Sequence, residues 1–155
     1  PNYKKFKNLE KNDNRLILLD FLNDNNMELY KDIYKQYPNS KFILQKRNKN
    51  NWLLSRCNFM NGDYYKHCNN RDNTNYSLQQ YIKIWSNNYD KHYQDVNNFF
   101  TDNDNFFNYN LNENNSFEKL KKFLEPDFII KNIDNIPTHK TFNTKYKLQD
   151  IINYI

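Results

Sequence analysis

The segment YPNSKFILQKRN, residues 37–48, contains the pattern that decides the fold prediction. Pro38 ends a helical pattern, Asn39 and Ser40 favour a turn, and a short apolar run follows before Arg47. This order predicts a buried strand with an arginine at its carboxyl end, where the next helix begins. Ligands bind at that end of the strands in open parallel sheets. The segment therefore indicates an α/β protein that handles an anion.

Strand and helix patterns alternate on both sides of this segment. Apolar runs predict strands over residues 15–20, 41–46 and 105–111. Helical spacing predicts helices over 27–37, 48–60, 76–100, 116–124 and 146–154, and residues 61–75 are predicted to form a loop. This alternation predicts one α/β domain over residues 1–155, with a mainly parallel sheet flanked by helices. Three strands are few for such a sheet, so we expect further strands before Pro1 and an incomplete N-terminus.

Composition is compatible with one folded domain of modest core. The chain has 155 residues, 37% of them hydrophobic, with 32 Asn and a single Gly. Such an Asn content also occurs in prion-like tracts. Here the Asn residues alternate with periodically spaced apolar residues, and much of the bias follows from AT-rich codons. We therefore predict a folded chain.

Charge favours an anionic partner. The formal net charge is +5 and the isoelectric point is about 9.0. Because the basic residues are dispersed and form no recognised nucleic-acid motif, nucleic acid is not the favoured partner. A basic nucleic-acid-binding protein is an alternative supported by the isoelectric point and the aromatic content alone. An anionic nucleotide explains the charge equally well. No apolar run approaches the ~18 residues of a membrane span and no signal peptide is visible, so the default expectation is a cytoplasmic protein that does not bind membranes.

The two cysteines do not form a disulfide framework. Cys57, Cys68 and His67 are near one another in sequence, but a fourth ligand at zinc spacing is missing. We therefore predict no metal site. Thiols in a reducing compartment are the expected state of both cysteines.

Several segments between residues 15 and 126 form one recognisable series: YK (30–31), YPNSKFIL (37–44), RN (47–48), WLLS (52–55), HY (92–93), FFNYNL (106–111) and SFEKLKKFL (116–124). Together they resemble the middle of the sulfotransferase family. This resemblance implies a P-loop NTPase-like fold that uses 3′-phosphoadenosine 5′-phosphosulfate as co-substrate. It also implies transfer of a sulfuryl group to a hydroxyl or amine acceptor, for which a carbohydrate is one candidate.

The resemblance implies that Arg47 and Ser55 bind the 3′-phosphate of this donor. A planar guanidinium and a hydroxyl suit a doubly charged phosphate. The alternative is that Arg47 pairs with a surface carboxylate and that Ser55 is a solvated helix residue.

One part of the family pattern is missing from this sequence. The phosphosulfate-binding loop of the family follows a strand and contains Lys-Ser/Thr-Gly-Thr-type residues. The only glycine here, Gly62, is not followed by Lys-Ser/Thr. Either the loop lies upstream of Pro1, or the chain is a catalytically inactive sulfotransferase-like binding or interaction module.

Position along the chain suggests three further site residues and a structural role for the tryptophans. Asp20 ends the first predicted strand and is the candidate general base, with a capping or loop aspartate as the alternative. Lys140 and Lys145 lie in a basic segment that could cover the phosphate. Trp52 and Trp85 are expected to pack in the core rather than stack on adenine.

Overall fold

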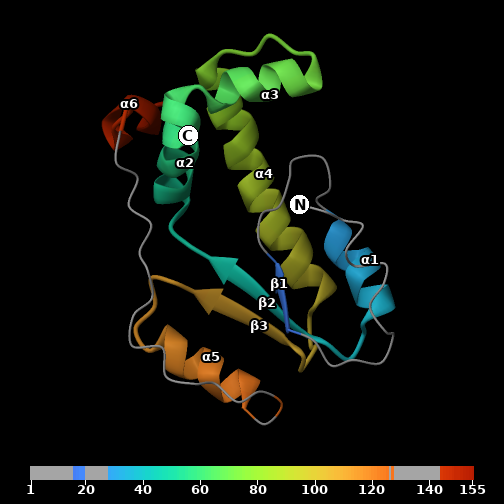
Figure 1. The fold of residues 1–155 in the computed structure, drawn as a ribbon. Coiled ribbons are helices and arrows are strands. Elements are labelled where there is room, and N and C mark those ends of the chain that lie inside the picture. The colour runs from blue at the N-terminus through green and yellow to red at the C-terminus, as the bar shows by residue number, and fades with distance from the viewer. Residues whose placement is uncertain (1–15, 20–27, 126, 128–143) are drawn as a thin grey trace. The chain divides into compact units, whose positions relative to one another are not determined.

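A computed structural model describes residues 16–19, 28–125, 127 and 144–155 (Figure 1). The elements in chain order are β1 (Leu16–Leu19), α1 (Leu29–Gln36), β2 (Lys41–Lys46), α2 (Lys49–Asn58), the 3-10 helix η2 (Phe59–Gly62), α3 (Tyr64–Asp72), α4 (Leu78–Phe99), β3 (Phe106–Asn110), α5 (Ser116–Leu124) and α6 (Leu148–Ile152). The three predicted strands and the five predicted helices are all present. Strand β2 and helix α5 have the predicted bounds, and over the described residues the others are two to four residues shorter than predicted.

The strands form one parallel sheet in the order β1-β2-β3. Ile17 lies opposite Phe42 in the first pair, and Phe42 lies opposite Phe106 in the second. The predicted mixed α/β fold with a parallel sheet is therefore confirmed, whereas the sulfotransferase fold itself stays a prediction. Among the described residues, no helix is both long enough and apolar enough to cross a membrane.

The chain divides into two compact units. The sheet unit comprises Pro1–Lys46 and Asp95–Lys131, and the helical unit comprises Arg47–Gln94 and Asn132–Ile155. Helix α4 contributes to both, because the division falls after Gln94.

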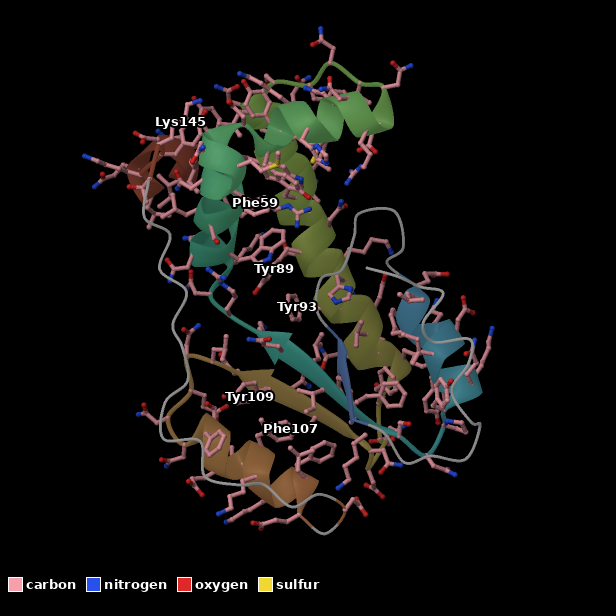
Figure 2. The ribbon with its side chains drawn as sticks, viewed as in Figure 1. Phe59, Tyr89, Tyr93, Phe107, Tyr109 and Lys145 are labelled. Atoms are coloured by element: carbon pink, nitrogen blue, oxygen red, sulfur yellow. The ribbon has the colours of Figure 1, made fainter. Side chains whose placement is uncertain are left out.

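Aromatic side chains pack on both faces of strands β2 and β3 in the sheet unit. On one face, Phe42 is fully buried and its ring centroid lies 4.9 Å from that of Phe100, which in turn stacks on Phe106 at 4.7 Å. On the other face, Phe107 stacks on Phe123 of α5 at 5.1 Å (Figure 2). This arrangement follows from strand geometry, since neighbouring residues of a strand point to opposite faces.

The helical unit has its own apolar core. Its centre consists of seven buried residues from α2, α3, α4 and α6: Leu53, Cys57, Cys68, Tyr81, Ile82, Trp85 and Ile151. Trp52 packs against this cluster while remaining half-buried. The expectation that both tryptophans pack in the core is confirmed.

The predicted loop over residues 61–75 is wrong, because most of it is helical. The 3-10 helix η2 ends at Gly62, α3 follows, and Asn73 ends α3 with a left-handed φ of 52°. In α3 only Cys68 is fully buried, while Tyr64 and Tyr65 pack against the same core and stay partly exposed. These contacts with other segments stabilise a helix that its own mostly polar sequence does not predict.

Gly62 provides a close contact in the helical unit. Its φ is +84°, and a Cβ added there would lie 2.4 Å from Lys145 Cδ and 2.9 Å from Tyr146 Cε2. A glycine is required where a left-handed backbone meets so close a neighbour. The single glycine of the sequence therefore serves chain packing.

Candidate anion-binding site

Arg47 is the first residue after β2, and the residue that follows it caps the next helix. The side chain of Asn48 accepts a hydrogen bond from the Asn51 amide at 3.1 Å, so α2 begins at Lys49. Asn is one of the residues preferred at this capping position. The remaining amides of the first turn give this end of α2 a partial positive charge.

The Arg47 side chain lies back along α2. Its Nη2 donates to the carbonyl oxygen of Asn51 at 2.9 Å. Arg47 itself precedes the helix, so its place is given by this hydrogen bond. Asn51 and Ser55 are four residues apart within α2, and such residues lie on one flank of a helix. The Arg47 guanidinium therefore contacts the flank of α2 that carries Ser55, and both residues are partly exposed. A guanidinium has five donor hydrogens, so this bond leaves several for a ligand.

Helix α4 fixes the backbone at Arg47. The hydroxyl of Tyr89, a residue of α4 that Figure 2 labels, donates to the Arg47 carbonyl oxygen. Its ring lies 5.1 Å from that of Trp52 and 4.5 Å from that of Tyr93. Burial raises the pKa of Tyr89, so the phenol stays protonated and can donate. The position of Arg47 therefore depends on a residue 42 positions further along the chain.

A second cation lies in the first turn of α2. Lys49 Nζ is 2.6 Å from the carboxylate of Asp90, the residue after Tyr89. The Lys49 side chain is 26% exposed and that of Asp90 is 62% exposed. The beginning of α2 therefore has two basic side chains, Arg47 and Lys49. Within the described ranges of the chain, Lys49 is paired with a carboxylate and Arg47 is not.

Lys145 lies at the other end of α2. The side chain of Asn58, the last residue of α2, donates to the Tyr146 carbonyl at 3.0 Å and accepts from the Tyr146 amide at 2.8 Å. Ten helical residues separate this end from Asn48, roughly 15 Å along the axis. The structure therefore does not bring Lys145 next to Arg47.

The contacts of Lys145 are structural ones (Figure 2). Its Nζ lies 3.3 Å from Asp63, and the hydrogen bond to this carboxylate raises the pKa of Lys145. Asp63 also pairs with Lys66 at 3.1 Å. The other two candidates, Asp20 and Lys140, lie outside the described residues.

Sequence reasoning missed an arginine that joins three helices. The guanidinium carbon of Arg56 lies 4.9 Å from the Trp52 ring centroid, 5.3 Å from that of Tyr64 and 5.1 Å from that of Trp85. Three aromatic faces around one cation stabilise the packing of α2 against α3 and α4. The four-residue spacing of Trp52 and Arg56 on α2 was the available signal, but the other two rings come from distant positions.

Both cysteines are buried free thiols in the helical core. Burial raises the pKa of Cys57 to about 11, so its thiol is protonated at neutral pH. His67 stacks on Tyr64, with ring centroids 6.1 Å apart. Among the described residues, no three His, Cys, Asp or Glu side chains gather in a way that could hold a metal ion.

A comparison of the chain with protein-family models, curated proteins and solved structures finds no match. The resemblance to the sulfotransferase family therefore depends on the residues quoted above. The structure adds an α/β fold and the placement of Arg47 and Ser55.

Proposed function

We propose that the chain is a sulfotransferase-like domain in which Arg47 and Ser55 bind the 3′-phosphate of 3′-phosphoadenosine 5′-phosphosulfate. The donor's sulfuryl group would be transferred to a hydroxyl or amine acceptor. The observation that carries the proposal is the shared flank of α2, on which the Arg47 guanidinium is hydrogen-bonded one turn before Ser55.

The chemistry of this flank suits a phosphate. Arg47 offers a planar fork that can donate two parallel hydrogen bonds to phosphate oxygens. Ser55 adds a neutral donor, and the amino terminus of α2 adds a favourable dipole. Neither Arg47 nor Ser55 faces a carboxylate within ion-pair or hydrogen-bond distance in the described part of the chain. In this respect Arg47 differs from a surface arginine whose guanidinium forms an ion pair with a carboxylate.

The proposal assigns the phosphate-binding part of a donor site. Sulfuryl transfer also needs backbone amides close to the transferred group, which usually requires glycine. Gly62 is not available for this role, because it packs against Lys145 and Tyr146. The second form of the proposal is therefore a sulfotransferase-like module that binds the nucleotide without transferring the sulfuryl group.

Calorimetric titration with adenosine 3′,5′-bisphosphate tests the phosphate site. We expect Arg47→Ala to weaken binding at least tenfold, since hydrogen bonds to charged groups contribute about 1.5–3 kcal/mol each. Arg47→Lys keeps the charge but loses the fork, so it should recover only part of the affinity. Ser55→Ala should weaken binding about fivefold, as expected for one hydrogen bond of about 1 kcal/mol.

Lys83→Ala is the matched control, because Lys83 is an exposed basic residue of α4 in the same unit. Its affinity should equal that of the wild type. Wild-type protein that does not bind the bisphosphate would overturn the proposal. Equal losses in Arg47→Ala and Lys83→Ala would show that binding follows net charge rather than this site.

An activity assay separates the two forms of the proposal. The protein is incubated with the phosphosulfate donor and a panel of hydroxyl and amine acceptors, and the release of adenosine 3′,5′-bisphosphate is followed. Acceptor-dependent release that is lost in Arg47→Ala supports the transferase. Binding without release supports the inactive module.

A further inference from the structure

The ion pair between Lys49 and Asp90 lies at the same end of α2 as Arg47. Tyr89 and Asp90 are neighbours on α4. Tyr89 contacts Arg47, the residue before Asn48, and Asp90 contacts Lys49, the residue after it. Tyr89 donates to the Arg47 carbonyl, and Asp90 lies 2.6 Å from Lys49 Nζ. One turn of α4 therefore contacts both basic residues of the proposed phosphate site.

Electrostatics agree with this proximity. Burial is the main cause of the raised pKa of Tyr89; beside it, the charge of Asp90 raises this pKa and that of Arg47 lowers it. Arg47 and Asp90 therefore both act on the Tyr89 hydroxyl, and Asp90 is the carboxylate that pairs with Lys49. Because Arg47 and Lys49 are two residues apart at the beginning of α2, an anion bound there is attracted by both charges.

The two basic residues differ in their partners. The guanidinium of Arg47 donates to a neutral carbonyl, whereas the ammonium of Lys49 is held by a carboxylate. The Asp90 side chain is 62% exposed, so it can rotate into water at little cost. A phosphate can therefore exchange places with it.

We propose that Asp90 is an internal counter-ion that occupies Lys49 in the unliganded protein, and that a phosphate held by Arg47 displaces it and recruits Lys49 as the second cation of the site. This inference rests on the proposed function. Asp90 then competes with the nucleotide: it lowers the affinity of the free site and neutralises Lys49 when no phosphate is bound.

A double-mutant cycle tests the competition. The dissociation constant for adenosine 3′,5′-bisphosphate is measured by calorimetry for wild type, Asp90→Asn, Lys49→Met and the double variant. We expect Asp90→Asn to tighten binding roughly two- to fivefold, the range for release of an exposed ion pair. Lys49→Met should weaken binding by a similar factor. In the Lys49→Met background, Asp90→Asn should change the affinity by less than about 1.5-fold.

The cycle distinguishes competition for Lys49 from a general field effect. If Asp90→Asn tightens binding equally with and without Lys49, the carboxylate acts only through its charge and the proposal is overturned. Asp72→Asn removes a carboxylate of α3 that pairs with Arg71, and it should leave the affinity unchanged. Urea unfolding of each variant verifies that the fold is retained.

Failure of the two proposals can be told apart. A wild-type protein that does not bind the bisphosphate overturns the proposed function and the inference with it. A wild type that binds through Arg47, with no effect of Asp90→Asn, overturns only the role of Asp90.

Discussion

The sheet unit is held by stacked aromatic rings, whereas the helical unit combines an apolar core with polar contacts between distant segments. In the former, Phe42 and Phe106 both pack against Phe100 at ring distances below 5 Å. In the latter, Tyr89 contacts a residue 42 positions away, and Asn58 one that is 88 positions away. The candidate site lies in the helical unit. Its geometry therefore depends on a few directional bonds as well as on hydrophobic burial.

The largest loss of stability in each unit should come from truncation of one of its core residues. Trp85 and Phe42 are both fully buried. We expect Trp85→Ala and Phe42→Ala each to lower the free energy of unfolding by about 3–5 kcal/mol. Urea denaturation measures the loss, and hydrogen exchange locates it. Exchange should rise in α2, α3 and the first part of α4 for Trp85→Ala, and in β2 and β3 for Phe42→Ala.

Conservative variants control for this experiment. Trp85→Phe and Phe42→Leu keep most of the buried apolar volume. Each should lower the free energy of unfolding by less than half as much as the alanine variant at the same position. If either alanine variant raises exchange equally in both units, the two units unfold together and the contrast between them fails.

Removal of the Asn58 side chain should lower the stability of the helical unit alone, and by less than the core truncations do. Its side chain is 3% exposed and bonds to the backbone of Tyr146 in both directions, and to the Leu54 carbonyl at 3.0 Å. Asn58→Ala leaves the Tyr146 groups without this partner, which should cost about 2–3 kcal/mol. Asn70→Ala, an exposed Asn to Ala change in α3, should cost almost nothing. Equal urea midpoints for the two variants would contradict the role of Asn58.

Burial of the Cys57 thiol should make the stability of the protein depend on pH, with a smaller effect than the substitutions above. Its folded pKa is about 11 against an ordinary value of 9.0, so between these values the unfolded chain loses the proton first. Stability should therefore fall as pH rises from about 9 to about 11, by on the order of 2 kcal/mol for this group.

Urea unfolding at pH 7 and pH 10.5 measures this effect. Other groups also titrate in that range, so the comparison is with Cys57→Ala. This variant should be less stable at pH 7 because of the lost side chain, but it should lose less stability between the two pH values. An identical loss in both proteins would show that the Cys57 thiol does not titrate differently on unfolding.

The contrast between the units also explains which parts of the fold could be predicted. Strands β2 and β3 were predictable because apolar residues run together between turn residues, as in FIL at 42–44. The long helix α4 shows clear periodicity over more than five turns. In α3, by contrast, only Cys68 is fully buried, and Tyr64 and Tyr65 beside it are too few to form a clear apolar stripe. Its fold depends on core residues contributed by other segments, which are not visible from its own sequence.

The candidate site was predictable to a similar extent. Arg47 and Ser55 are only eight residues apart, just before and within the helix predicted over residues 48–60, so the sequence alone could assign both to one site. The partners on α4, Tyr89 and Asp90, are some forty residues away and no local pattern connects them to Arg47. Lys145 was placed in the site by its charge and position in the chain, yet it contacts Asp63 at the far end of α2.

The most direct test of the central claim is a titration of isotope-labelled protein with adenosine 3′,5′-bisphosphate, followed by nuclear magnetic resonance. The account predicts shifts concentrated at the amides of residues 47–55 and at the Nε of Arg47, with little change around Asp63 and Lys145. Shifts that are absent from this segment, or that are distributed over the exposed lysines of both units, would contradict it.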